Sequence, residues 1–124
     1  MRRWASVWER AWPQADVAAI SELYLDEAVF YSHPFRHPQA PGDYVAWAFA
    51  EQETAECRFG EPLVDGDRAA VDWWAVITAR DGSVQSIAGT SLLRFDETGR
   101  VLEQRDAWGY QEGARDVPDW APTG

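Results

Sequence analysis

The sequence predicts an α+β fold in which a curved, mainly antiparallel sheet wraps three N-terminal helices. Apolar residues before residue 55 recur at helical spacing, whereas the segments after it read as strands divided by short turn signals. The 124 residues are 46% hydrophobic, which suffices for one substantial core. We therefore expect a single domain over residues 1–124, with an ordered core over about 3–112 and a polar, proline-rich tail over 113–124.

The first two helices are predicted from spacing and caps. In "RRWASVWERAW" the residues Trp4, Trp8 and Trp12 recur every four positions, so they lie on one helical face, and Pro13 should end the helix. Asp16 is a suitable N-cap for a second helix through "VAAISELYL".

A strand, a loop and a third helix should follow. "EAVFYSH" reads as a strand and "PFRHPQAPG" as a loop that contains three prolines. Asp43 is then the expected cap of a helix through "YVAWAFAEQE".

The second half predicts an antiparallel meander. The turn signals "DGD", "RDG" and "DETG" divide this part of the chain into strands. The predicted strands are "ECRFGEPLV", "RAAVDWWAVITA", "SVQSIAGTSLLRF" and "RVLEQRDAWGY". Trp120 is the expected anchor of the tail.

Composition excludes several classes of function. A net charge of −10 disfavours nucleic acid and anionic membranes as partners. All eleven basic residues are arginine, which removes Schiff-base lysine chemistry. Without a phosphate loop, a CxxC or an HExxH motif, we expect no cofactor and no metal. The single Cys57 and the lack of an apolar signal or membrane segment favour a cytoplasmic location.

The order of elements resembles a known superfamily. Helix, helix, "LYLDEAVFYSHP", helix and a meander ending in "LLRFDETGRVLEQRDAW" resemble the SnoaL-like branch of the nuclear transport factor 2-like superfamily over nearly the whole chain. The resemblance implies a cone-shaped cavity between helices and sheet, and a homodimer through the outer sheet face. The superfamily includes ketosteroid isomerases, polyketide cyclases, dehydratases, epoxide hydrolases and non-catalytic binders, so the fold leaves the function open.

Turn lengths predict which strand residues face this cavity. A two-residue turn at Asp81-Gly82 would pair Asp72 with Ser91 and Trp74 with Gly89. A four-residue loop at "DETG" would pair Ser91 with Gln104 and Gly89 with Asp106. The face that carries these residues is mainly apolar, and we assign it to the cavity. A slip of one residue in either turn would exchange the two faces of a strand.

Three residues are candidates for acid or base catalysis. Asp72 and Asp106 are predicted to lie on an apolar, tryptophan-rich face, where burial would raise their pKa values. Alternatively, each carboxylate is paired with an arginine, bonded by indole N–H groups or turned to solvent. In the resemblance His33 falls near the general base of ketosteroid isomerases, and an imidazole is a competent base. The alternative for His33 is a turn residue fixed by Pro34.

Other positions limit the reactions and metal sites that the resemblance allows. The resemblance aligns Trp8 with the first-helix tyrosine of ketosteroid isomerases and Ser91 with their oxyanion-binding acid, so steroid isomerisation is not expected. Tyr31 is the alternative phenol donor. His37 lies deeper in the loop, and no third ligand supports a metal site with His33.

We expect a small apolar or aromatic molecule in the cavity and cofactor-free acid/base catalysis of the isomerase, cyclase or dehydratase type. The alternative is a non-catalytic ligand-binding or dimeric interaction module. A third reading, an epoxide-hydrolase-like Asp/Arg/Asp arrangement, requires Arg58 or Arg105 in the cavity. The predicted catalytic residues are His33, Asp106 and Asp72. The predicted ligand-binding residues are Trp8, Trp12, Tyr31, Phe59, Trp74, Gly89, Ser91, Gln104 and Trp108.

Overall fold

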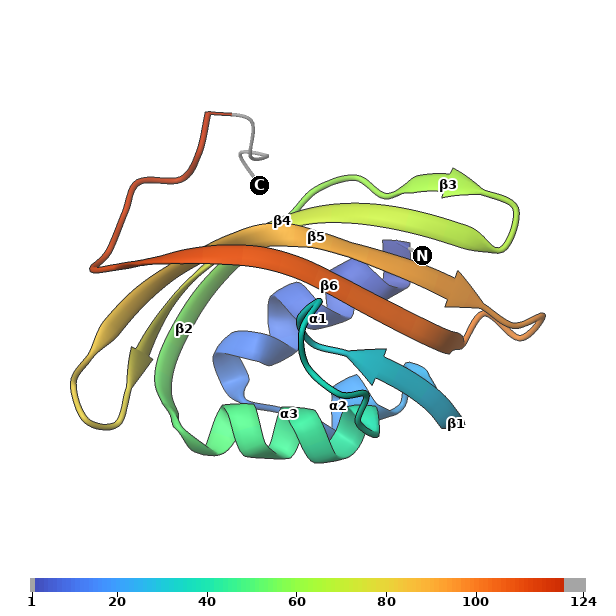
Figure 1. Ribbon diagram of the computed structural model, residues 1–124, viewed down its shortest axis with the longest axis horizontal. Coiled ribbons are helices and arrows are strands. Elements are labelled where there is room, and N and C mark those ends of the chain that lie inside the picture. Colours follow the sequence, from blue (N-terminus) through green and yellow to red (C-terminus); the bar gives the residue numbers. More distant parts are fainter. Residues whose placement is uncertain (1, 120–124) are drawn as a thin grey trace.

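A computed structural model describes residues 2–119 and confirms the predicted α+β class. The elements are α1 (Arg2–Gln14), α2 (Val17–Ser21), β1 (Tyr24–Tyr31), α3 (Pro41–Ala50), β2 (Gln52–Phe59), β3 (Leu63–Asp65), β4 (Arg68–Ala79), β5 (Val84–Phe95) and β6 (Val101–Glu112). The sheet is strongly curved, and the helices lie on its concave side (Figure 1).

The sheet has the strand order β1-β6-β5-β4-β2, with β3 paired to β4. The pairs β2–β4, β3–β4, β4–β5 and β5–β6 are antiparallel, which confirms the predicted meander. β1 pairs with β6 in parallel and so closes one edge of the sheet with a segment from the first third of the chain.

Helix α1 continues through Pro13 to Gln14, past the predicted stop. A proline inside a helix removes the N–H that would bond the carbonyl four residues earlier, here that of Glu9. The thiol of Cys57 on β2 donates to the Glu9 carbonyl at 3.5 Å and partly replaces the lost partner. The proline is therefore accommodated in the last turn.

The second and third helices differ from the prediction at their ends. α2 ends at Ser21, and Tyr24 is already in β1, because the carbonyl of Leu23 accepts a hydrogen bond from the Val101 N–H. α3 begins at Pro41 and not after Asp43, since a proline fits the first turn, where its missing N–H has no helical partner.

The predicted register between β4 and β5 was wrong by one residue. The turn is a three-residue loop, in which the Ala79 N–H bonds the Ser83 carbonyl and Gly82 has a φ of 89°. Trp73 therefore pairs with Gly89, and Asp72 with Thr90. Because side chains alternate along a strand, this slip turns Trp73 to the concave face and Asp72 to the outer face.

The register between β5 and β6 differs from the prediction by two residues, so the predicted faces hold. Ser91 pairs with Asp106 and Gly89 with Trp108. The loop that joins the strands spans one residue more than predicted, and the register shifts between Arg94 and Phe95. Ser91 and Asp106 thereby become direct cross-strand neighbours on the concave face.

The described part of the tail folds back over the sheet. The carbonyl of Gly113 accepts a hydrogen bond from the Ser86 hydroxyl, and the N–H of Arg115 donates to the same hydroxyl, both at 2.8 Å. The predicted anchor Trp120 lies outside the described residues. Among residues 2–119, no helix combines the length and the apolar character that crossing a membrane requires.

Candidate functional site

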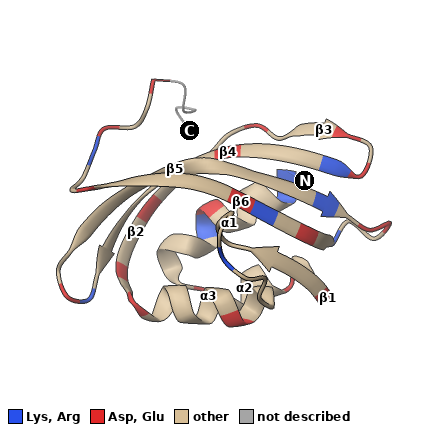
Figure 2. Cartoon of the chain, in the orientation of Figure 1, with Lys and Arg blue, Asp and Glu red and all other residues tan. Residues whose placement is uncertain are grey.

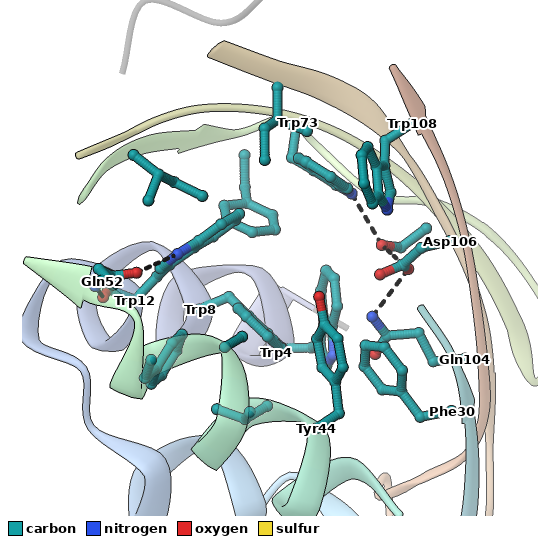
Figure 3. A pocket seen from close by; sticks show the side chains of 17 residues that line it. Trp4, Trp8, Trp12, Phe30, Tyr44, Gln52, Trp73, Gln104, Asp106 and Trp108 are labelled. Carbon is teal, nitrogen blue, oxygen red and sulfur yellow. Dashed lines mark hydrogen bonds between the residues drawn. The ribbon is translucent and has the colours of Figure 1, made fainter. Parts of the chain in front are cut away.

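A cavity of about 90 Å³ lies between helices α1 and α3 and the concave face of the sheet (Figure 3). Its floor is buried, and its rim consists of half-buried side chains such as Trp12, Tyr44, Ile87 and Trp108. The lining residues are Trp4, Trp8, Trp12, Phe30, Tyr44, Val45, Ala48, Phe49, Gln52, Phe59, Trp73, Ile77, Ile87, Ser91, Gln104, Asp106 and Trp108.

Nine of the seventeen lining residues are aromatic, and five of these are tryptophans. Helix α1 contributes Trp4, Trp8 and Trp12, so the predicted stripe of tryptophans faces the cavity. The Trp12 ring packs edge to face against Trp8 at 5.7 Å and against Trp73 at 5.9 Å between ring centroids. Such tilted contacts between rings fix the side chains and give the walls a defined shape.

The indole N–H groups of all five lining tryptophans donate to protein acceptors. The acceptors are Tyr24 Oη for Trp4 and Trp8 (both 3.2 Å), Gln52 Oε1 for Trp12 (3.0 Å), Ser91 Oγ for Trp73 (2.9 Å) and the Ser32 carbonyl for Trp108 (2.6 Å). The tryptophans therefore present carbon surface and π-electrons to a ligand, while their polar groups hold the protein together.

Asp106 is the charged residue of the lining. Its Oδ1 atom accepts hydrogen bonds from Ser91 Oγ at 2.6 Å and from Gln104 Nε2 at 3.0 Å. Within the described part of the chain, no hydrogen bond from protein reaches Oδ2. One carboxylate oxygen is thus held in place, and the other accepts no hydrogen bond from the described residues.

The pKa of Asp106 is raised from 3.8 to about 7. Desolvation by the surrounding side chains is the main cause, and the hydrogen bonds from Ser91 and Gln104 oppose it without cancelling it. At neutral pH the carboxyl group therefore exists in comparable amounts as acid and as base, which suits a group that gives and takes protons.

Tyr24 determines how Gln104 is oriented. Its hydroxyl accepts the N–H groups of Trp4 and Trp8 and donates to Gln104 Oε1, so the amide nitrogen of Gln104 points at Asp106. Burial raises the pKa of Tyr24 and keeps the phenol neutral. Tyr24 thus lies behind the lining and ensures that Gln104 donates a hydrogen bond to Asp106 through its amide nitrogen.

Tyr44, and not the predicted Tyr31, supplies a phenol group to the cavity. It lies on α3 in the lining, and its ring stacks on Phe30 at 4.9 Å. Burial raises the pKa of Tyr44, and the charge of Asp106 raises it further, while Arg36 lowers it. Tyr44 was not among the predicted site residues, although its spacing of four from Ala48 marks one face of the helix.

Neither histidine lines the cavity. The His33 ring packs edge to face on Trp108 at 4.9 Å, and its Nδ1 accepts the Phe35 N–H at 3.4 Å. His37 is exposed in the same loop. Over residues 2–119 no hydrogen bond joins His33 to Asp106, and only Asp106 belongs to the lining, so a catalytic role for His33 stays a prediction.

The slip between β4 and β5 removes two further candidates from the cavity. Asp72 is exposed on the outer face, where it accepts the Thr90 hydroxyl at 3.0 Å. Trp74 is buried away from the lining, in a hollow that it shares with the returning tail and Pro118. Trp73 alternates with Trp74 along β4, so the predicted register turned it to the outer face, but the structure places it in the wall of the cavity.

Two other predicted positions also lie outside the lining. Tyr31 alternates along β1 with Phe30, and it is Phe30 that reaches the cavity. A Cβ atom at Gly89 would lie 2.5 Å from the Cβ of Trp108 and 2.4 Å from the carbonyl oxygen of Ala107. The glycine therefore makes room for β6 and the Trp108 ring, and not for a ligand.

The epoxide-hydrolase-like arrangement is not formed. Neither Arg58 nor Arg105 lines the cavity, and the exposed Arg105 forms an ion pair with Glu103 at 3.5 Å. The residues that the structure describes contain no group of three potential metal ligands. Seven of the predicted residues do lie in the lining: Trp8, Trp12, Phe59, Ser91, Gln104, Asp106 and Trp108.

Residues 2–104 match the family described as the SnoaL-like domain. The chain therefore belongs to the SnoaL-like family of the nuclear transport factor 2-like superfamily, as the order of its elements indicated. A search of curated proteins found no match.

Solved structures share the fold at low sequence identity. The epoxide hydrolase/cyclase-like enzyme SalBIII, which has a role in pyran ring formation in the polyether salinomycin, has 17% identity and a TM-score of 0.75, over 87% of this chain and 89% of that one. A ketosteroid isomerase-like protein from Catenulispora acidiphila, solved with trimethylamine, has 15% identity and a TM-score of 0.72, over 83% and 82%. An NTF2-like protein from an Exiguobacterium species has 17% identity and a TM-score of 0.71, over 87% and 96%.

Proposed function

We propose that the protein binds a small, largely apolar molecule in its aromatic cavity and transfers a proton to or from it through Asp106. The observation that carries the proposal is the asymmetric carboxylate. Oδ1 is held by Ser91 and Gln104, while Oδ2 has no partner among residues 2–119 and lies in a mainly apolar cavity. A catalytic acid or base requires a fixed position, a pKa near the working pH and an open face toward the ligand.

The chemistry that this arrangement supports is proton transfer without a cofactor. As a base, Oδ2 takes a proton from a C–H bond next to a carbonyl group, and the electron pair of that bond moves onto the carbonyl oxygen. The Tyr44 hydroxyl is the available donor for that oxygen. Return of the proton from Asp106 to another carbon completes an isomerisation. If the carboxyl proton first exchanges with solvent water, its return to the same carbon replaces the original hydrogen with one from solvent. Both outcomes restore the carboxylate.

The cavity size limits the ligand. A cavity of about 150 Å³ lined by apolar side chains binds benzene. The 90 Å³ measured here therefore suits a molecule smaller than a single six-membered ring, or the end of a longer molecule that extends through the rim. The Catenulispora relative was solved with trimethylamine, which supports a ligand of this size. The cyclase-like SalBIII supports acid/base chemistry on the same fold.

The second candidate is a binding module without catalysis. It is favoured by the absence of a second charged residue or a histidine among the seventeen described lining residues, since many acid/base enzymes use a pair of titratable groups. In this candidate Asp106 only positions the ligand. Hydrogen exchange at carbon separates the two functions, because binding alone leaves C–H bonds intact.

The test is a deuterium-exchange screen. Small carbonyl compounds are incubated in D₂O with the wild-type protein, with Asp106→Asn and with Asp72→Asn, and deuterium incorporation is followed by NMR. Asp72 is the matched control, because it is an aspartate on the outer face of the same sheet. Catalysed exchange by the wild type and by Asp72→Asn, with loss in Asp106→Asn, supports the proposal. Exchange that Asp106→Asn retains contradicts the role of Asp106.

We also propose that the outer sheet face forms a homodimer. Leu92 is 45% exposed there and pairs with the exposed Arg105 on β6. A mixed apolar and charged surface suits a reversible interface. Sedimentation of the wild type at twice the mass of the chain, with a shift toward the monomer in Leu92→Glu, supports a dimer through this face. A monomeric wild type contradicts it.

A further inference from the structure

We propose that the ligand of this cavity carries a small organic cation, an alkylated ammonium group of the trimethyl or tetramethyl class, held among the aromatic walls and facing Asp106. The inference rests on the proposed function, because it names the class of ligand for the same site.

The first argument is the chemistry of the walls. The face of an aromatic ring attracts a cation, tryptophan most strongly, and aromatic cages recognise methylated ammonium groups in this way. Here the five lining indoles use their N–H groups within the protein, so they offer π-surface and no donor to the ligand. Three phenylalanines and Tyr44 complete the aromatic lining.

The second argument is the shortage of hydrogen-bond donors. The hydroxyl of Ser91 and the amide of Gln104 donate to Asp106, and the amide of Gln52 donates to the Trp12 carbonyl at 2.8 Å. The second N–H of each amide and the hydroxyl of Tyr44, which lies beside Arg36 and Ser32, are the remaining polar hydrogens of the described lining. These donors are neutral, and no described lining side chain carries a positive charge, so an anionic ligand would lose its hydration shell without gaining a counter-charge, which is unfavourable.

The third argument is the charge of the lining. The described lining contains the carboxylate of Asp106 and neither arginine nor histidine. Coulomb attraction between an ammonium group and Oδ2 is strong in a poorly solvated cavity. The exposed Arg36 opposes a cation at the rim, since its guanidinium carbon lies 5.4 Å from the centre of the Trp108 ring. That same contact shows that the Trp108 ring accepts a cation at the rim.

The surroundings also favour a cation. The chain carries a net charge of −10, and α3, which forms one wall of the cavity, has Asp43 as its charged residue (Figure 2). A negative field raises the local concentration of cations near the entrance. A tetramethylammonium ion has five heavy atoms, so its size is close to what 90 Å³ holds.

A cationic ligand also fits the proposed chemistry. A positive nitrogen next to a C–H bond lowers the pKa of that bond, because it stabilises the negative charge left on carbon. The electron pair still moves onto the carbonyl oxygen, as in the proposed step, and the nearby positive charge further lowers the cost of proton removal by Asp106 in a cavity with few donors for an oxyanion. The cation in the ligand performs the stabilisation that hydrogen-bond donors perform in other enzymes.

Ligand affinity should depend on pH through Asp106. A cation binds the ionised carboxylate better than the neutral acid, so affinity should rise as the pH passes through about 7 and level off above it. The other titratable groups near the carboxylate are Tyr44 and Tyr24, both of which stay neutral in this range because burial raises their pKa values. His33 packs on Trp108 outside the lining, and His33→Gln is the control for its contribution.

The experiment compares tetramethylammonium with tert-butanol, a neutral molecule with the same number of heavy atoms. Binding is followed by the shifts of the indole N–H signals in ¹⁵N NMR spectra of the full chain. The proteins are the wild type, Asp106→Asn and the outer-face control Asp72→Asn, each at pH 6 and pH 8.5. In Asp106→Asn the amide oxygen still accepts hydrogen bonds from Ser91 and Gln104, so the fold is expected to persist. The indole spectrum itself reports whether it does.

We expect the wild type to bind tetramethylammonium at least about tenfold more tightly than tert-butanol at pH 8.5. This preference should shrink at pH 6, disappear in Asp106→Asn, and remain in Asp72→Asn and His33→Gln. If the wild type binds tert-butanol as tightly as tetramethylammonium or more tightly, the inference of a cationic ligand is wrong, whereas the proposal of a small apolar ligand still holds. If neither compound shifts the indole signals, the cation inference also fails. Deuterium exchange then decides independently whether the proposed proton transfer survives.

Discussion

Replacement of Asp106 by asparagine should change how the stability of the fold depends on pH. The folded state raises the pKa of Asp106 from 3.8 to about 7, so it holds the proton more tightly than the unfolded chain does. A group with a raised pKa contributes stability at low pH and loses it as the pH rises through the folded value. Asparagine has no such titration.

The magnitude follows from the two pKa values. Each pKa unit corresponds to about 1.4 kcal/mol, so ionisation of Asp106 removes about 4 kcal/mol from the free energy of unfolding between low and high pH. About 3 kcal/mol of this loss should fall between pH 4.5 and pH 8.5, since the unfolded carboxyl group is already mostly ionised at pH 4.5. The free energy of unfolding of Asp106→Asn, measured relative to that of the wild type, should therefore increase by about 3 kcal/mol from pH 4.5 to pH 8.5.

The assay is urea unfolding of the wild type, Asp106→Asn and Asp72→Asn at several pH values between 4.5 and 8.5. Titration of the other carboxylates affects all three proteins and cancels in the differences. The difference between Asp106→Asn and the wild type should grow with pH, whereas that for Asp72→Asn should stay nearly flat. A constant difference for Asp106→Asn would show that the carboxyl group is not desolvated, and the reasoning from burial would be refuted.

Three other substitutions or reactions test the surroundings of the site. Gly89→Ala should destabilise the fold by about 1–3 kcal/mol in urea unfolding, because the new methyl group meets β6 at 2.4–2.5 Å; an unchanged midpoint would contradict this close approach. Tyr24→Phe should raise the pKa of Asp106 in a ¹³C NMR titration, because Gln104 loses the partner that aims its amide N–H; an unchanged pKa would mean that other contacts orient Gln104. Burial raises the pKa of Cys57 to about 12, so the thiol should react with a thiol reagent at pH 8 only as fast as the fold opens, and rapid labelling of the native protein would disagree.

The fold could be predicted because its signals are local. The four-residue spacing of tryptophans in α1 specifies one face, and that face does line the cavity. The glycine-containing turns marked the strands of the meander, and the order of elements identified the family. These features depend on spacing and turn chemistry within a few residues, which a single sequence contains.

The site could be predicted only in part, because it depends on register. The loop between β4 and β5 is one residue longer than predicted. As a result Trp73, and not Trp74, lines the cavity, and Asp72 lies on the outer face. The shift of two residues between β5 and β6 preserved the face, so the predictions for Asp106 and Ser91 survived it. Turn signals indicate the position of a turn better than its length. An error of one residue in the register turns every side chain of the strand to the other face, whereas an error of two residues keeps the faces.

The position of α3 could not be predicted from the sequence. Tyr44 enters the cavity because the helix lies across the concave face of the sheet, and no local signal specifies that orientation. The motif around His33 looked catalytic because of its residue types. Its ring instead packs edge to face on Trp108 and is not among the lining residues.

The parallel pairing of β1 with β6 determines when the site forms during synthesis and folding. Tyr24 and Gln104 are 80 residues apart, and β1 finds its partner only after the last strand has been made. A nascent chain that ends before residue 101 contains all three helices and the β4–β5 hairpin, but it lacks Asp106 and the strand that β1 requires. Contacts between distant segments form slowly, because a long loop must close before they stabilise anything. The carboxylate and the tyrosine behind it are therefore assembled in the final step of folding, and a chain that lacks β6 leaves the other four tryptophans of an unfinished cavity exposed to aggregation.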